Sequence, residues 1–226
     1  MTPPIARIRW QPCYRIIPSR FPPIQLFERV ADPQDLEAVF ALEALTNPRL
    51  RDEVGDIRLV PPDERISGPG TSIIMAAFTH LNPDGSRFSD GSYGVFYAGL
   101  EIETAIAETR YHRARFLRAT AQGPMELDMR VYAVDLDSDL HDLRGASAEQ
   151  PLLYHPDNYS PAQHLARQLR DGGSNGIAYD SVREAGGSCA AVFRPRLLAN
   201  ARQERHLCYV WNGQKVKTVY EKRALS

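Results

Sequence analysis

Predicted β-strands dominate the second half of this chain, and their arrangement limits the fold more than any other feature. Residues 125–136 (MELDMRVYAVDL) alternate apolar and polar side chains, which is the pattern of a half-buried strand. Two further apolar runs follow at 176–182 and 188–194, and a last pair of runs flanks Asn212-Gly213, a strong hairpin signal. The sequence therefore predicts a sheet whose strands come mainly from this half.

The predicted helices do not alternate strictly with the strands. They cover residues 32–45, 71–80, 101–117 and 160–171, and the earlier strands cover 5–17, 57–60 and 94–99. This order favours an α+β fold over a doubly wound parallel sheet. Because we find no internal repeat and no linker, we expect one domain over residues 1–226, with residues 20–80 as an insertion packed on the same core.

The clearest helix, residues 101–117, carries two polar side chains beside its apolar face. The members of that face are Ile102, Ala105, Ile106, Thr109 and Phe116. Glu108 and His112 lie together at its edge, four residues apart. A carboxylate at such an edge is partly desolvated and could stabilise positive charge on a substrate. An ordinary Glu–His pair on a solvated helix is the alternative.

Composition argues against several classes of protein. The chain has 27 basic and 28 acidic side chains, whereas nucleic-acid-binding domains usually carry a basic excess. No apolar run approaches the roughly 18 residues that span a bilayer, and MTPPIARIRW lacks the apolar segment of a signal peptide. The 3 cysteines and 6 histidines show no metal-ligand pattern. We expect a cytoplasmic protein with free thiols, no metal, and no direct contact with nucleic acid or membrane.

A series of short motifs runs along the chain. In order, they are CYR at 13–15, SRFSDGSYGVFYAGL at 86–100, ETAIAE at 103–108, NYSPAQ at 158–163, GIAYDSVR at 176–183 and FRP at 193–195. This series resembles the RES domain family, which is named for its Arg, Glu and Ser residues. The resemblance covers about residues 12–196 without the segment 20–80, and FYAGLEIETAIAE is its most specific part. SRFSD stands where the family usually has GGRWN.

The resemblance implies a fold like that of the ADP-ribosyltransferase toxins, in which a split β-sheet binds NAD⁺ as a substrate in a cleft. The implied reaction breaks the bond between nicotinamide and ribose. Family members are toxins of bacterial toxin–antitoxin pairs, usually encoded beside an Xre-type antitoxin. Some transfer the ADP-ribose to phosphate, some to water, and some to a protein such as a nucleotide-synthesis enzyme.

Two arginines are candidates for binding the diphosphate of NAD⁺, since guanidinium groups match phosphate oxygens. Arg15 stands in an apolar strand between Tyr14 and Ile16, and an edge-strand arginine pointing to water is the alternative. Arg87 stands in the turn-rich loop of residues 82–92, where a plain surface charge is equally consistent with the sequence.

Three further residues are candidates for contacts around the bond that breaks. Tyr97 ends a short strand and would stack on nicotinamide or bind ribose, with a half-buried core tyrosine as the alternative. Glu108 would stabilise the positive ribose, bind one of its hydroxyls or activate the acceptor. His112 would orient Glu108 or contact a phosphate, or it is a surface histidine.

Two serines compete for the role of the family's serine. Ser160 is expected to be the N-cap of the helix 160–171, with Pro161 at the first helical position. Since a helix N-terminus is also an anion site, we prefer Ser160 as a catalytic and NAD⁺-binding residue. Ser181, inside a predicted strand, is the second candidate.

Three functions remain open on the sequence alone. The first is a toxin that consumes NAD⁺ and is held inactive by its antitoxin. The second is a mono-ADP-ribosyltransferase with one specific host protein as target, which would use the same site with a different acceptor. The third is a non-catalytic binding module, and the joint presence of Arg15, Tyr97, Glu108 and Ser160 argues against it.

Overall fold

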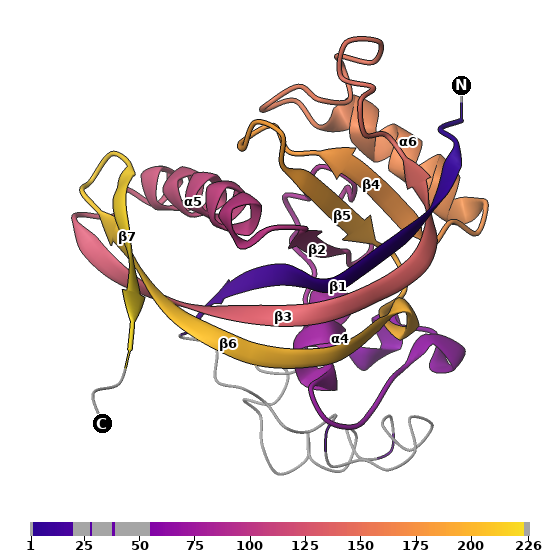
Figure 1. The fold of residues 1–226 in the computed structure, drawn as a ribbon, viewed down its shortest axis with the longest axis horizontal. Helices are drawn as coiled ribbons and strands as arrows, with labels where there is room; N and C mark the ends of the chain where they lie inside the picture. Colours follow the sequence, from indigo (N-terminus) through magenta and orange to yellow (C-terminus); the bar gives the residue numbers. More distant parts are fainter. Residues whose placement is uncertain (1, 20–27, 29–37, 39–54, 224–226) are drawn as a thin grey trace.

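The computed structural model describes residues 2–19, 28, 38 and 55–223 (Figure 1). The helix predicted at 32–45 therefore lies outside the described residues, apart from Ala38. Of the predicted insertion at 20–80, the part from residue 55 onward is described, and it packs against the main body through Ile57, Val60 and Ile74.

Seven strands form one mixed sheet in the order β1-β2-β5-β4-β3-β6-β7, with a further pairing between β1 and β3. Their bounds are Ile5–Pro18 (β1), Phe96–Gly99 (β2), Met125–Asp142 (β3), Gly176–Asp180 (β4), Ser188–Val192 (β5), Leu198–Trp211 (β6) and Val216–Lys222 (β7). Only β3 and β4 run parallel among the paired strands of the described chain. The α+β class is confirmed.

The sheet is split into a long part and a short part. In the long part, β3 pairs with β1 along one edge and with β6 along the other, and β7 follows β6. The short part, β2-β5-β4, meets the long strands at two narrow joints, Tyr14 opposite Gly99 and residues 141–142 opposite residues 177–178. This is the split sheet that the resemblance implied, and its two parts bring distant segments of the chain together.

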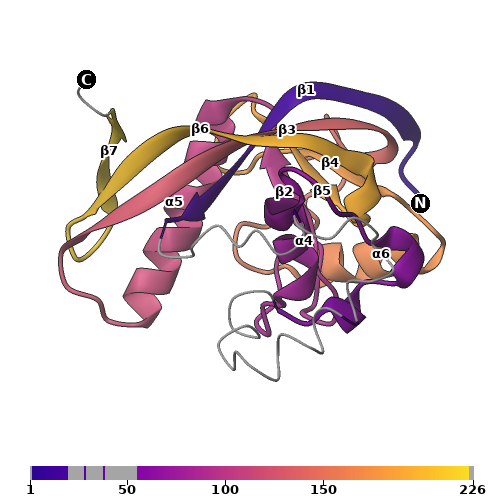
Figure 2. The same ribbon diagram turned by 90° about the horizontal axis from the view of Figure 1, so that it is seen from below.

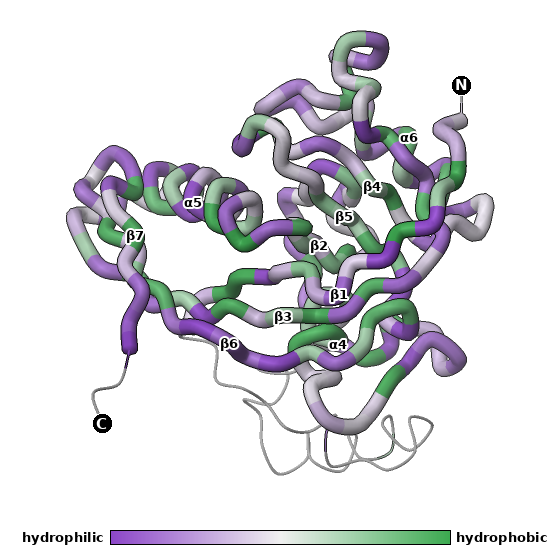
Figure 3. Tube along the Cα trace, viewed as in Figure 1, coloured by the Kyte–Doolittle hydropathy of each residue, from purple (hydrophilic) through white to green (hydrophobic). Residues whose placement is uncertain are grey.

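The three helices described from residue 55 onward lie on one side of the long strands, as Figure 2 shows. They are α4 (Thr71–Thr79), α5 (Ile102–Ala119) and α6 (Ser160–Asp171). Helix α5 packs on the β1, β3, β6 and β7 side chains of one apolar cluster, and α6 packs on β4 and β5 through Ala162, Ala166 and Leu169. Figure 3 shows β4 and β5 as an apolar centre and the middle of β6 as hydrophilic, in line with its exposed residues.

Two local predictions from the sequence are wrong. Residues 57–60 are not a strand, because Ile57–Leu59 form a 3₁₀ helix (η2). The Asp56 side chain accepts the Arg58 N–H at 3.0 Å and also binds the Arg58 guanidinium, which closes the turn. Ile57 and Val60 then point into the core three residues apart, as the 3₁₀ period requires. Two further 3₁₀ turns occupy Pro62–Glu64 (η3) and Pro195–Leu197 (η4).

The second wrong prediction concerns the end of β3. The sequence predicts this strand only over residues 125–136, but the strand continues to Asp142. The reason is a partner far away in the sequence, since residues 5–9 of β1 pair with residues 137–141 of β3. Ser138 and Leu140 stay buried on alternate positions of this extension.

Trp211 tests how much the packing under α5 contributes to stability. Its side chain is 1% exposed, and its indole N–H donates to the Gln122 carbonyl at 3.0 Å. We expect Trp211→Ala to lower the free energy of unfolding by about 3–5 kcal/mol, because it leaves a cavity and an unpaired carbonyl. Urea denaturation measures the loss, with Trp211→Phe as a milder control. A loss below about 1 kcal/mol for Trp211→Ala would contradict this packing.

Candidate active site

A cavity of about 770 Å³ lies between the long strands, α4 and the loop of residues 81–95. Its lining includes two of the predicted site residues, Arg15 from β1 and Tyr97 from β2. Arg113 of α5 and Arg130 of β3 add two more guanidinium groups to the wall. Helix α4 contributes apolar side chains to the wall, and Glu28 contributes a carboxylate. A cavity with an apolar wall and several arginines suits a ligand that combines rings with negative charge.

Arg15 has the features of an anion-binding side chain. One of its terminal nitrogens donates to the Tyr97 carbonyl at 3.2 Å, and its guanidinium lies 4.6 Å from the centre of the Phe96 ring. Among the described residues it has no carboxylate partner, and its buried Nε has no hydrogen-bond partner at all. Burial lowers the pKa of Arg15 to about 10, so that the group stays charged at neutral pH. A charged guanidinium with spare donors beside a cavity can bind phosphate.

Tyr97 is fixed by its hydroxyl group and keeps its ring at the cavity. The phenolic oxygen accepts the Phe88 N–H at 2.9 Å and lies 2.8 Å from Ser86 Oγ. Gln163 of α6 in turn donates to the Ser86 carbonyl at 2.9 Å, so that α6 steadies this loop. Burial raises the pKa of Tyr97, and the hydroxyl therefore stays neutral. The ring is held as a rigid surface rather than as a proton donor to a ligand.

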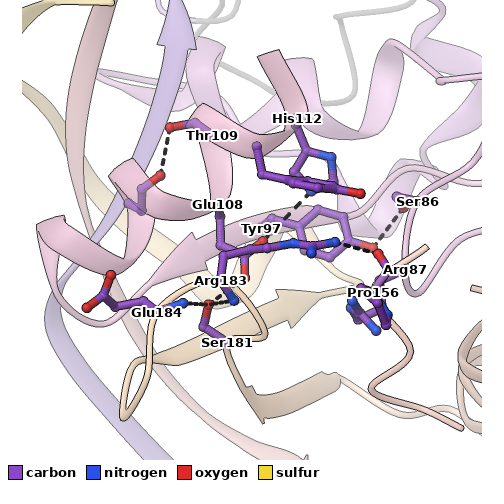
Figure 4. A network of polar contacts seen from close by, with 12 residues as sticks. Ser86, Arg87, Tyr97, Glu108, Thr109, His112, Pro156, Ser181, Arg183 and Glu184 are labelled. Carbon is purple, nitrogen blue, oxygen red and sulfur yellow. Dashed lines mark hydrogen bonds and ion pairs between the residues drawn. The ribbon is translucent and has the colours of Figure 1, made fainter. Parts of the chain in front are cut away.

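The Glu108 carboxylate is held by Ser181, as Figure 4 shows. Ser181 Oγ lies 2.6 Å from Glu108 Oε1, and the same oxygen accepts the N–H groups of Arg183 and Glu184 at 3.0 Å each. Both backbone groups donate to the serine oxygen, so its single hydrogen is directed to Glu108. The Glu108 side chain is 20% exposed, which leaves part of the carboxylate accessible.

The turn after β4 lies close against α5. Gly187 accepts the Ser181 N–H at 2.8 Å, and a Cβ on Gly187 would lie 2.5 Å from Thr104 Oγ1 of α5. A side chain at this position would push the turn away from the helix, and with it the hydroxyl of Ser181. Glycine is therefore required where the short part of the sheet meets α5.

Helix α5 presents a polar stripe to this turn and to the loop before α6. The stripe consists of Glu108, Tyr111, His112 and Arg115, at the i, i+3, i+4, i+7 spacing of one helix face. Beside this stripe the helix buries Ala105, and on its other side it buries Ala114 and Leu117, whereas Phe116, predicted to be apolar core, is 45% exposed.

Sequence reasoning missed Tyr111. Its hydroxyl bonds to Asp157, and its ring stacks against Arg183. The helical spacing from Glu108 could have found it.

His112 lies beside the free side of the carboxylate. Its Nε2 is 3.8 Å from Glu108 Oε2, and 46% of its side chain is exposed. Desolvation, and after it the positive charges of which Arg183 is the strongest, lower the pKa of His112. The imidazole is therefore neutral at neutral pH, and its contact with Glu108 is not an ion pair.

Arg87, predicted either to bind phosphate or to be a plain surface charge, is buried (7% exposed) and does not line this cavity. Its Nη1 donates to the carbonyls of Leu153 and His155 at 2.8 and 3.1 Å, and its guanidinium stacks 4.7 Å from the Tyr159 ring. Arg87 thus holds the loop before α6. In Figure 4 it lies beside the group formed by Glu108, Ser181 and His112, which we call the Glu108 cluster.

The predicted N-cap of α6 is off by one residue. Tyr159 is the N-cap, and Ser160 is the first helical residue, exposed, with its N–H on Asn158 Oδ1 at 3.2 Å. The helix begins earlier because the Asn158 side chain, rather than that of Ser160, accepts a hydrogen bond at this turn. The structure brings Ser181, and not Ser160, to Glu108.

The site thus has two parts with Tyr97 between them. Arg15 and the cavity lie on one side, and the Glu108–Ser181 pair with His112 lies on the other. Across the described ranges, no group of three metal-binding side chains is found and no helix is long and apolar enough to cross a membrane. The cysteines Cys13, Cys189 and Cys208 are free and buried.

Comparisons with known proteins give one family. The family described as "RES domain" matches residues 62–212, which include Tyr97, Glu108 and Ser181 but not Arg15. A protein of Sinorhizobium fredii, uncharacterized protein y4oC, is 32% identical over 212 residues, covering 92% of this chain and 86% of that protein.

A solved structure shares a weaker likeness. It is the crystal structure of the M. tuberculosis MbcT-MbcA toxin-antitoxin complex, 10% identical, with 92% of this chain and 87% of that chain covered. Its TM-score of 0.41 is too low to establish a shared fold.

His112 gives a test of the charge around the carboxylate. We expect its pKa to lie well below the ordinary 6.5, at about 4, because burial disfavours the protonated ring and the nearby arginines, Arg183 above all, repel its charge. The unfolded chain then binds more protons below pH 6.5, so this group makes the fold less stable as pH falls from 6.5 towards 4. An NMR titration of the His112 ring measures the value. A pKa above 6.5 would show that Glu108, and not the arginines, controls His112.

Proposed function

The chain belongs to the RES domain family, and from this premise we propose that it is the toxin of a toxin–antitoxin pair and breaks the nicotinamide–ribose bond of NAD⁺. One observation carries the proposal. The Glu108 carboxylate is held by Ser181, while Arg15, which has no carboxylate partner among the described residues, lines the cavity together with Tyr97. These are the groups that a positively charged ribose and a diphosphate need.

The bond between C1′ of ribose and the nicotinamide nitrogen breaks with its electron pair passing to nicotinamide, which leaves neutral. Positive charge then develops on the ribose ring. A carboxylate next to that ring stabilises the charge, and in a partly buried site the effect is larger than in water. Glu108 is suited to this role because Ser181 fixes one of its oxygens and leaves the other free.

Arg15 would hold the diphosphate and Tyr97 would carry nicotinamide or the ribose face. The guanidinium of Arg15 has an unpartnered Nε and lies at the cavity wall, and the Tyr97 ring is rigid because both of its hydroxyl contacts are made. Apolar residues of α4 line the far wall and suit an adenine ring. Remote binding of this kind positions the bond that reacts.

The acceptor of the ADP-ribose distinguishes the versions of this function. Water would make the chain an NAD⁺ glycohydrolase, phosphate a phosphorylase, and a protein side chain an ADP-ribosyltransferase with a host target. In each case an acceptor oxygen or nitrogen forms the new bond to C1′. Water or a protein N–H or O–H group loses a proton in this step, whereas a phosphate oxygen is already negatively charged and need not. A non-catalytic module remains the competing hypothesis, and a complete Glu108–Ser181 pair is not what a degenerate site would keep.

A cognate antitoxin of the Xre type is the proposed partner. It would act by covering the cavity and the Glu108 cluster, since both open to the surface. Such control suits an enzyme that consumes a central metabolite in the cytoplasm.

The experiment that tests the function uses purified protein and NAD⁺. Nicotinamide release is followed with and without phosphate, and transfer of labelled ADP-ribose is followed with host lysate. Fast release without labelled protein would support NAD⁺ degradation, and dependence on phosphate would identify phosphorolysis. Slow release with one labelled band would support a protein target. No release from folded protein free of antitoxin would favour the binding module.

Glu108→Gln isolates the charge of the carboxylate. We expect nicotinamide release to fall by about 10²–10⁴-fold with the thermal midpoint little changed, because the amide keeps the shape but loses the negative charge. Glu103→Gln is the matched control, since Glu103 is an exposed glutamate on the same helix. Equal activity of the two variants would remove Glu108 from the site.

Ser181→Ala and Ser160→Ala separate the two candidate serines. Loss of the hydrogen bond to the Glu108 carboxylate is expected to lower kcat by about 10–100-fold, the equivalent of about 1.5–3 kcal/mol. Ser160→Ala is expected to leave kcat unchanged, because the Ser160 hydroxyl has no hydrogen-bond partner among the described residues. Steady-state kinetics decide, and the reverse order of effects would restore Ser160 as the functional serine.

A further inference from the structure

Arg183 closes the GIAYDSVR motif and has no part in the chemistry above. It lies in the turn between β4 and β5, two residues after Ser181. Its guanidinium carbon is 3.3 Å from the centre of the Tyr111 ring, and its Nη2 donates to the Pro156 carbonyl. Figure 4 shows its side chain running past Glu108 towards Pro156.

These contacts join three separate segments. The turn after β4 supplies Arg183, α5 supplies Tyr111, and the loop before α6 supplies the Pro156 carbonyl. Tyr111 strengthens the link because its hydroxyl bonds to Asp157 in the same loop. His155 Nδ1 completes the loop by accepting the N–H groups of Asp157 and Asn158 at 3.1 and 2.8 Å.

Arg183 and Tyr111 are direct neighbours of the candidate catalytic residues. Ser181 accepts the backbone N–H of Arg183, and His112 follows Tyr111 on the helix. The Nε of Arg183 is buried without a hydrogen-bond partner among the described residues. An unpaired buried donor is unfavourable for the fold, and a side chain kept only for stability would be expected to avoid it.

We propose that Arg183 is a positioning residue for Glu108: stacked on Tyr111 and bonded to Pro156, it fixes the loop of residues 155–158 and the Ser181 turn around the carboxylate. Its role in catalysis rests on the proposed function, whereas its effect on the loop and on His112 does not. The substrate then meets a wall that is already formed, which lowers the cost of ordering at the reacting bond.

The charge of Arg183 acts on the same cluster. His112 is faced by Glu108, Arg113 and Arg115 from α5, by Arg87 from the loop after α4, and by Arg183 from the turn after β4. Among these cations Arg183 has the largest effect in lowering the pKa of His112. A neutral His112 adds no positive charge of its own next to Glu108, so that the carboxylate keeps more of its attraction for a positively charged ribose.

The test compares Arg183→Gln and Arg183→Lys with the wild type. Arg170→Gln is the matched control, because Arg170 stacks on Tyr93 at 4.5 Å from the ring centre and lies outside the cavity lining. Three readouts are taken: kinetics of nicotinamide release, NMR titration of His112, and hydrogen exchange of the Asp157 and Asn158 amides.

For Arg183→Gln we expect kcat to fall by about 10–100-fold with KM little changed, since geometry at the reacting bond is lost rather than affinity. The pKa of His112 should rise and the two amides should exchange faster. Arg183→Lys keeps the charge without the planar stack, so it should restore the low pKa of His112 but leave the amides fast and kcat only partly recovered. Arg170→Gln should match the wild type in all three readouts.

Two results would overturn the proposal. One is an Arg183→Gln variant whose His112 titration and amide exchange are those of the wild type. The other is a loss of activity that only follows a fall in thermal midpoint and occurs equally in Arg170→Gln. If the wild type does not cleave NAD⁺, the proposed function fails, while the titration and the exchange still decide whether Arg183 organises the cluster.

Discussion

The hydrogen bond from Ser181 to Glu108 ties the short part of the sheet to α5, and the site depends on this contact. Ser181 stands where β4 ends, and Glu108 stands in the middle of a helix that packs on the long strands. The bond forms only when both parts of the sheet and α5 are correctly positioned. The turn after β4 lies so close to α5 that a Cβ on Gly187 would collide with Thr104. The narrow joints of the split sheet therefore set the geometry of the chemistry.

Charge is distributed unevenly in a chain that is almost neutral overall. The net charge is −1, yet four arginines lower the pKa of one histidine beside Glu108, and another arginine lies at the cavity without a carboxylate partner. The bulk charge of the chain does not reveal this local excess. A pocket of positive charge around one carboxylate suits a ligand with both a diphosphate and a cationic ring.

The sequence predicts well the elements whose pattern is local and less well those that depend on distant partners. The α5 periodicity and the Asn212-Gly213 hairpin are local signals, and the structure confirms both elements. The end of β3 depends on its pairing with β1, and the choice between Ser160 and Ser181 depends on which of them reaches α5. No local pattern carries that information. Tyr111 is different, because its helical spacing from Glu108 is a local signal. That signal becomes useful only when the structure shows that this stripe of α5 faces other polar segments.

A crystal structure of the Glu108→Gln variant with NAD⁺ tests the central claim most directly, since the variant is expected to bind the dinucleotide without consuming it. We expect the diphosphate on the Arg15 guanidinium and the nicotinamide–ribose bond between the Tyr97 ring and residue 108. A dinucleotide bound elsewhere, or bound in the cavity with its ribose remote from residue 108 and Ser181, would contradict the role of Glu108 at the ribose.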